Sequence, residues 1–193
     1  RIGDFIWAAA DMRTKGFLIG GTAGRTTLAG EGLQHQDGHS HLMASVIPNL
    51  KAYDPAFAYE IAIIIYDGMK RMYVDQENVF YYLTLENENY AQPTIKENID
   101  DGILKGMYQL HSEIEENSPK AQLLASGSMV NEALEAAKIL KEDWHISTCI
   151  WSVTSYSELH REAENKNRWN ILHPKEEEKI PYVSTCLQKK NGP

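Results

Sequence analysis

One short stretch, GEGLQHQDGHSH, holds the densest set of groups in the chain that can transfer protons or bind metals. Its members are Glu31, His35, Asp37, His39 and His41. Histidine titrates near neutral pH, so its imidazole can both donate and accept protons. Imidazoles and carboxylates are also common ligands of transition metals. The stretch therefore predicts a place where a proton, an anion or a metal is handled.

Three interpretations of this stretch are open. An acid/base or anion-recognition site is favoured, because Gly30, Gly32 and Gly38 let the backbone approach a ligand closely. A metal site is the least favoured, because the spacing fits neither an HExxH helix nor a CxxC framework, and we expect no metal ligand here. The third interpretation is a solvated, turn-rich loop whose histidines hydrogen-bond to the backbone.

Two further glycine-containing stretches could bind anions but are interpreted structurally. GGTAGRTTLAGEG lacks both the GK[ST] ending of a P-loop and the GxGxxG of a dinucleotide fold, so its glycines are turn formers. ASGSMVNEA places Gly127 and Ser128 at a strand-to-helix junction, where helix amides can bind an anion. We favour an N-cap role for the Ser128 hydroxyl over an anion site.

Helices and strands must position these groups, and hydrophobic spacing predicts where they lie. Helices are expected at 1–16, 55–73, 128–144 and 157–170. Strands are expected at 17–22, within 44–55 (interrupted by Pro48), and at 78–85, 107–111, 121–127, 145–155 and 182–186. Residues 20–41 are expected to form a long loop, and residues 100–106 an irregular connection.

The order of elements predicts an α/β fold with a boundary in the polar stretch EENSPK, around residues 115–120. We divide the chain into domains at 1–117 and 118–193. Strand, helix and strand follow one another after the boundary, which predicts two parallel strands joined by a crossover helix. The second domain looks truncated, because a parallel sheet needs several strands covered on both faces.

Composition excludes several classes of partner. The 193 residues are 42% hydrophobic and carry a net charge of −8, so binding to nucleic acid or to an anionic membrane surface is not expected. No apolar run is long enough to span a bilayer, and no signal peptide is recognised. Cys149 and Cys186 lack metal-ligand or redox spacing, which favours buried thiols in a reducing cytoplasm. Because the chain begins with Arg1, we expect a processed protein or a piece of a longer one.

Several long stretches closely resemble one enzyme family. They are GFLIGGTAGRTTLAGEGLQHQDGHSH, IPNLKAYDPAFAYEIAIIIYDGMKRMY and ENVFYYLTLENENY, followed by LLASGS, WSVTSYSEL and NRWNILHP. The chain resembles the homodimeric, bacterial-type decarboxylating component of pyruvate dehydrogenase across essentially its whole length. The resemblance implies a partial transketolase-like, thiamine-diphosphate-binding α/β fold: the latter part of the pyrimidine-binding domain (1–117) and the beginning of the C-terminal domain (118–193).

The resemblance also implies roles for four residues. His35 corresponds to the active-site histidine beside the reacting carbon of the cofactor and the bound pyruvate, and is thus also a cofactor-binding residue. Glu31 matches a glutamate near the active centre that is implicated in communication between the two sites of the dimer. Asp37 and His41 match residues that face the substrate channel. No role transfers to His39.

The implied activity is that of pyruvate dehydrogenase (acetyl-transferring), an oxidoreductase between glycolysis and acetyl-CoA synthesis. It decarboxylates pyruvate with thiamine diphosphate and Mg²⁺ and reductively acetylates lipoyl groups on the dihydrolipoyl transacetylase of a multienzyme complex. The ligands of magnesium and diphosphate are expected outside this chain. As an alternative, the chain alone is a non-catalytic structural or interaction piece, because a site built at a domain and subunit interface cannot close here.

Overall fold

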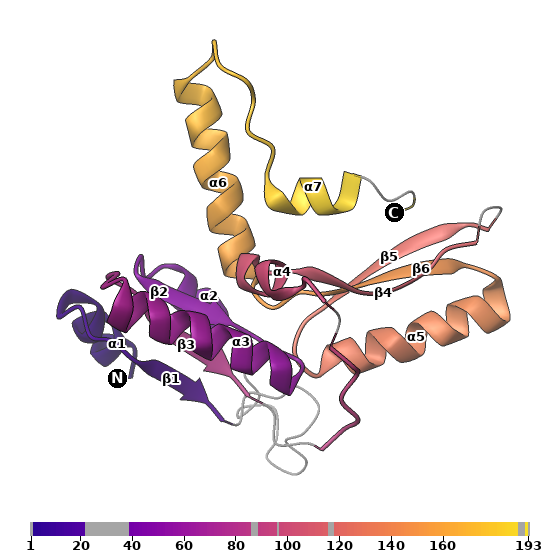
Figure 1. Cartoon of the computed structure of the whole chain (residues 1–193), viewed down its shortest axis with the longest axis horizontal. Coiled ribbons are helices and arrows are strands. Elements are labelled where there is room, and N and C mark those ends of the chain that lie inside the picture. Colours follow the sequence, from indigo (N-terminus) through magenta and orange to yellow (C-terminus); the bar gives the residue numbers. More distant parts are fainter. Residues whose placement is uncertain are drawn as a thin grey trace.

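The computed structural model describes residues 2–21, 39–85, 89–95, 97–115, 118–188 and 192, which form two three-stranded sheets with helices packed against them (Figure 1). The first sheet has the order β1 (Phe17–Gly20), β3 (Phe80–Thr84), β2 (Leu50–Tyr53). The second has the order β4 (Tyr108–Glu113), β6 (Ser147–Ser152), β5 (Lys120–Ala125). The helices are α1 (Ile2–Asp11), α2 (Ser40–Ser45), α3 (Ala58–Met69), α4 (Asp100–Lys105), α5 (Met129–Trp144), α6 (Tyr156–Leu172) and α7 (Tyr182–Gln188).

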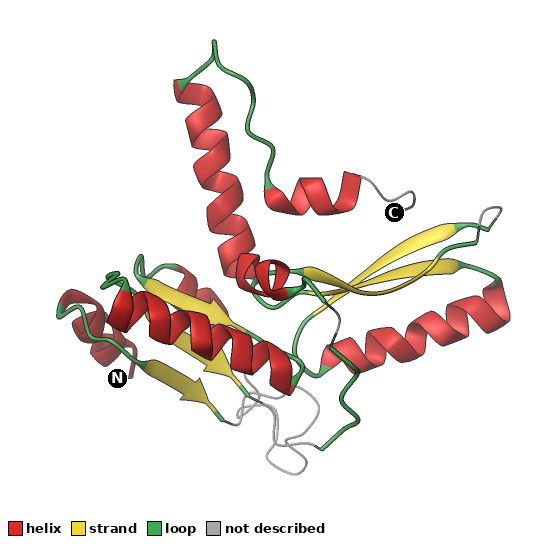
Figure 2. Cartoon of the chain, viewed as in Figure 1, coloured by secondary structure: helices red, strands yellow, loops and turns green. Residues whose placement is uncertain are grey.

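All strands of the first sheet are parallel, and β3 lies in its centre. Figure 2 shows helices on both faces of this sheet, with α3 on one face and α1 and α2 on the other. Close packing of α3 depends on Gly68, where an added Cβ would lie 2.9 Å from the Phe17 ring and 3.0 Å from the Tyr81 ring. The helix continues into a π-helical turn at Lys70–Val74, so the expected helix at 55–73 is confirmed.

The second sheet contains the expected crossover unit. Strands β5 and β6 are parallel and α5 joins them, which confirms the βαβ prediction. Strand β4 pairs with β6 in antiparallel orientation, so the sheet is mixed. Because β4 precedes residue 117, the expected boundary between 117 and 118 separates this strand from its sheet partner β6. Helix α6 points away from both sheets in Figure 1, and α7 returns toward the second sheet.

Three expectations about local structure were wrong. Residues 100–106 are not irregular: α4 forms there despite the helix-disfavouring Gly102, because Ile103 is completely buried and Gly106 ends the helix at φ 109°. Residues 182–186 form a helix rather than a strand, since Tyr182, Val183, Cys186 and Leu187 all pack against the buried cluster on the second sheet. Within 44–55, the strand begins only at Leu50, after Pro48, and residues 40–45 are helical.

The Ser128 N-cap was also predicted wrongly, whereas Ser155 caps α6. The Ser155 hydroxyl accepts from the Glu158 amide (3.1 Å) and donates to the Ala52 carbonyl (2.6 Å). Ser128 is buried, yet its hydroxyl has no hydrogen-bond partner among the residues that the structure describes. Its backbone already has helical dihedrals (φ −56°, ψ −25°), unlike the extended conformation from which an N-cap side chain reaches back to the helix amides.

We expect opposite responses to the loss of these two hydroxyls. Ser155→Ala removes a cap and the shorter of two hydroxyl hydrogen bonds to the Ala52 carbonyl, which keeps the one from Ser157 (3.3 Å). The substitution should therefore lower the free energy of unfolding by about 1 kcal/mol. Ser128→Ala removes a hydroxyl that makes no hydrogen bond, so the free energy of unfolding should change by less than about 0.5 kcal/mol or should rise. Urea unfolding measures the free energy of unfolding of both variants. An equal decrease in the two variants would contradict the expectation.

A buried glutamate joins the two sheets. Glu60 of α3 is completely buried, and one carboxylate oxygen accepts from the amides of Ala56 (2.6 Å) and Phe57 (3.2 Å). The other oxygen accepts from the hydroxyls of Tyr108 and Ser152, each at 2.7 Å. Tyr108 and Ser152 are cross-strand partners in the second sheet, so both hydroxyls reach the same oxygen. We call the first sheet with α1, α2 and α3 the first unit, and the second sheet with α5, α6 and α7 the second unit. Glu60 of the first unit therefore has all four of these hydrogen bonds only with the second unit in place.

This carboxyl group should make stability depend on pH. Burial raises the pKa of Glu60, and its four hydrogen bonds only partly oppose this rise. The stabilisation that results is fully present below the unfolded pKa of about 4.3 and is lost as pH rises through the higher folded pKa. In Glu60→Gln, the amide oxygen can accept from the two backbone amides, and its NH₂ can donate to the two hydroxyls.

We therefore expect the free energy of unfolding of wild type, relative to Glu60→Gln, to fall as pH rises from about 4.3 toward neutrality. Urea unfolding across that pH range measures the difference, with Glu142→Gln at an exposed position of α5 as the matched control. A difference between wild type and Glu60→Gln that is constant with pH would contradict the expectation.

Candidate active site

The predicted site residues fall only partly within the described structure. Glu31, His35 and Asp37 lie outside the described residues. His39 immediately precedes α2, and His41 lies in its first turn. Of the four residues with implied roles, His41 is therefore the one that lies within the described ranges.

His41 lies beside the carboxyl edge of the first parallel sheet. Strand β3 ends at Thr84, and Asp54 directly follows β2. Open parallel sheets bind their ligands at this edge, where loops leave the carboxyl ends of the strands. The His41 ring packs against Tyr82 of β3, with ring centroids 5.3 Å apart. The fold thus places His41, a predicted site residue, at the edge where α/β proteins usually bind their ligands.

A chain of polar contacts links His41 to a buried carboxylate. The Nε2 atom of His41 lies 2.9 Å from the Thr84 hydroxyl oxygen. Thr84 donates to Oδ1 of Asp54 at 2.5 Å, and Ser126 donates to Oδ2 at 2.8 Å. Asp54 and Thr84 are both buried, whereas His41 is only half-buried. The arrangement can orient the imidazole and support a charge on it.

Sequence reasoning missed Asp54 and Thr84 as site residues. Asp54 lies within the segment 44–55 and Thr84 within the expected strand at 78–85. Their only local signal is their position, at or just after the end of a predicted strand that belongs to a parallel sheet. That signal becomes informative only when the strand order is known.

An apolar groove lies on the α1 and α2 side of the same sheet. It has a volume of about 460 Å³, and its lining includes Trp7, Leu18, Met43, Ile47 and Tyr82. Tyr82 thus borders both the groove and the His41 ring. The polar contacts of His41 therefore adjoin an apolar surface on which a ring or short carbon chain could lie.

Both parts of the chain match family models. Residues 1–93 match the pyruvate dehydrogenase E1 component middle domain, and residues 106–193 match the transketolase-like C-terminal domain. The chain is 53% identical over 193 residues to the pyruvate dehydrogenase E1 component of Pseudomonas aeruginosa, covering 100% of this chain and 22% of that protein. It is 53% identical over 188 residues to the same component of Escherichia coli K12, covering 97% of this chain and 21% of that protein.

The chain belongs to the pyruvate dehydrogenase E1 component family. It spans about a fifth of the length of these relatives and corresponds to an internal segment of them. The family expected from the resemblance is therefore confirmed.

Solved structures confirm the transketolase-like fold of this E1 segment. A transketolase from Campylobacter jejuni superposes with a TM-score of 0.62 at 20% identity, over 82% of this chain and 23% of that one. A transketolase from Leishmania mexicana superposes with a TM-score of 0.60 at 16% identity, over 85% of this chain and 22% of that one. The likeness concerns the fold alone, at these levels of identity.

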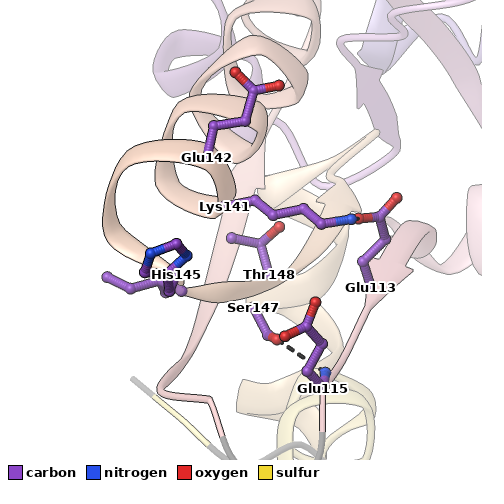
Figure 3. A pocket seen from close by; sticks show the side chains of 8 residues that line it. Glu113, Glu115, Lys141, Glu142, His145, Ser147 and Thr148 are labelled. Carbon is purple, nitrogen blue, oxygen red and sulfur yellow. Dashed lines mark hydrogen bonds and ion pairs between the residues drawn. The ribbon is translucent and has the colours of Figure 1, made fainter.

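A second, polar pocket of the E1 segment lies between β4, the end of α5 and the start of β6 (Figure 3). Its volume is about 340 Å³. Lys141 and Glu113 point toward each other and form an ion pair, which holds the pKa of the Glu113 carboxyl below its usual range. The Ser147 hydroxyl accepts from the Glu115 amide at 2.9 Å. These groups are engaged with one another, so the pocket offers no activated nucleophile.

The described part of the E1 segment holds no metal-binding cluster and no membrane helix. Within those ranges, no three His, Cys, Asp or Glu side chains are grouped so that they could hold a metal ion. Among the helices formed there, none is both long and apolar enough to cross a bilayer. Neither of the described cysteines forms a disulfide: Cys149 is buried, and Cys186 is partly exposed.

Proposed function

We propose that this chain forms one wall of the active site in the decarboxylating subunit of pyruvate dehydrogenase. The observation that carries the proposal is its 53% identity, over all 193 residues, to a pyruvate dehydrogenase E1 component. The position of His41 at the carboxyl edge of a parallel sheet supports it independently. In this proposal the whole subunit decarboxylates pyruvate and transfers the acetyl group to lipoyl groups.

The described residues fit part of a thiamine diphosphate site. The imidazole of His41 and the neighbouring apolar groove suit an organic ring and a small substrate. Within the described ranges, no three His, Cys, Asp or Glu side chains are grouped so that they could hold a metal ion. We propose that the ligands of Mg²⁺ and of the diphosphate lie outside this chain. When bound, thiamine diphosphate supplies the electron sink that makes loss of carbon dioxide possible.

The residues of this chain would bind and polarise the substrate. We propose that the His35 imidazole hydrogen-bonds the carbonyl oxygen of pyruvate and donates a proton to it as negative charge develops. An ionised Glu31 directly beside the pyruvate carboxylate would oppose binding, so we place Glu31 behind His35 or in a partly protonated state. Asp37 and His41 would line the path by which the substrate enters.

The assembly follows from the same family. We propose a homodimer that works in the cytoplasm, with dihydrolipoyl transacetylase as its partner in a multienzyme complex. Support comes from relatives named as E1 components, a name that implies further components. The net charge of −8 makes nucleic acid and anionic membranes unsuitable partners.

Removing the His35 imidazole should slow the full-length enzyme. His35→Ala is expected to lower pyruvate turnover at least about tenfold, because it removes a positioned proton donor. His160→Ala, at an exposed position of α6, is the matched control and should leave turnover unchanged. Steady-state assays of pyruvate-dependent acetyl transfer measure both variants, and wild-type turnover in His35→Ala would refute the assignment.

The 193-residue chain by itself should be inactive, since its site needs walls from elsewhere. We expect no pyruvate decarboxylation by the isolated chain and little binding of thiamine diphosphate with Mg²⁺. Isothermal titration calorimetry measures the binding, with the full-length subunit as the positive control. Tight binding by the isolated chain would overturn this expectation and show that its own residues complete the site.

A further inference from the structure

We propose that Thr84 and Asp54 are positioning residues that fix His41 in its Nε2–H tautomer, and that the β5–α5 turn of the second unit holds them in place. The inference rests on the proposed function only for its catalytic consequence. The tautomer itself follows from contacts within this chain and can be measured without any activity.

The number of available protons determines the tautomer. A threonine hydroxyl has one proton, and Thr84 donates it to Oδ1 of Asp54. The Thr84 oxygen therefore has only lone pairs to offer to His41, whose Nε2 lies 2.9 Å away. Nε2 must carry the hydrogen in this contact, and in the neutral ring Nδ1 is then the basic nitrogen.

The second unit holds Asp54 from several sides. The Asp54 amide donates to the Thr154 carbonyl (2.7 Å), and the Gly127 amide donates to the Asp54 carbonyl (3.1 Å). The Ser126 hydroxyl occupies the carboxylate oxygen that Thr84 does not use. Asp54 is only 8% exposed, so these contacts replace water around it.

Gly127 leaves space that the carboxylate requires. An added Cβ at this position would lie 2.9 Å from Oδ1 and 3.1 Å from Oδ2 of Asp54. The backbone there also has φ +54°, a conformation that residues other than glycine rarely adopt. Any larger residue would therefore displace the carboxylate that orients Thr84.

A histidine fixed in this way suits proton transfer better than one that flips between tautomers. In the proposed active site, His41 would not only line the substrate path but also exchange a proton through Nδ1, while Nε2–H stays bound to Thr84. The fixed orientation removes a step in which the ring would have to rotate before reacting. In this arrangement, a turn in the second unit controls the geometry of a histidine in the first.

Nuclear magnetic resonance of the ¹⁵N-histidine-labelled chain tests the tautomer directly. At a pH where His41 is neutral, wild type and Thr84→Ser should both show the Nε2–H pattern, because serine keeps the hydroxyl. Thr84→Val should show a mixture of tautomers, whereas Thr94→Val, at an exposed position, should match wild type. An Nδ1–H pattern in wild type, or an unchanged Nε2–H pattern in Thr84→Val, would overturn the proposal.

Variants in the second unit test the coupling. Gly127→Ala should shift the His41 tautomer in the direction of Thr84→Val, although residue 127 does not touch His41 in any described contact. Ser126→Ala, which removes one hydrogen bond without adding atoms, provides a milder variant should Gly127→Ala fail to fold. A tautomer unaffected by Ser126→Ala and by folded Gly127→Ala would remove the β5–α5 turn from the proposal.

Turnover of the full-length enzyme tests the positioning role. Thr84→Val should lower kcat at least about tenfold with a smaller change in KM, and Thr84→Ser should restore most of the loss. A mixture of His41 tautomers in Thr84→Val together with an unchanged kcat would overturn the positioning role. Because pyruvate turnover by wild type is measured in the same assay, that result would leave the proposed enzyme activity standing, and absent wild-type turnover would instead refute the proposed function.

Discussion

The carboxylate of Asp54 lies where the two sheets meet, and the geometry of the candidate site depends on how it is held. A buried carboxylate is costly unless hydrogen-bond donors replace the water it has lost. Thr84 of the first sheet and Ser126 of the second unit provide these donors. Because the two hydroxyls come from different units, Asp54 is satisfied only in one relative arrangement of the sheets. The orientation of Thr84 toward His41 follows from that arrangement.

Two other polar side chains, Glu60 and Arg161, impose the same arrangement of the two units. Glu60 of the first unit takes half of its hydrogen bonds from Tyr108 and Ser152 of the second sheet. In the opposite direction, the Arg161 guanidinium of α6 donates to the carbonyls of Leu50 and Ile47, at 2.6 and 2.7 Å. Apolar packing tolerates small shifts, whereas hydrogen bonds weaken steeply with distance and angle. These polar contacts thus make the junction between the units specific in its orientation.

The candidate site lies at the carboxyl edge of the first sheet. In the first sheet, all strands are parallel, and their carboxyl ends lie beside His41 and the groove that Tyr82 borders. The chain spans about a fifth of the length of these relatives. A site assembled from several domains can exclude water and bring charges together only once all its walls are present. In the proposed active site, the contacts of the second unit with Asp54 would support one such wall.

Much of the fold could be predicted from local sequence. The helical spacing of α5 and the β-branched and aromatic character of β3 are properties of a few neighbouring residues, and both elements were predicted correctly. The histidine-rich stretch GEGLQHQDGHSH was likewise found from its composition alone. Helix α4 was missed because Gly102 disfavours an isolated helix, whereas the complete burial of Ile103 helps to stabilise it in the fold.

The sequence alone determined most of the longer helices and strands, the parallel βαβ unit and the family, because these depend on local patterns and on long stretches of similar residues. Only the tertiary structure decided that His41, Thr84, Asp54 and Ser126 lie together. Forty-three residues separate His41 from Thr84, and 72 separate Asp54 from Ser126. No local spacing encodes such contacts, because they arise when strand order and the packing of the two units bring distant segments to one edge.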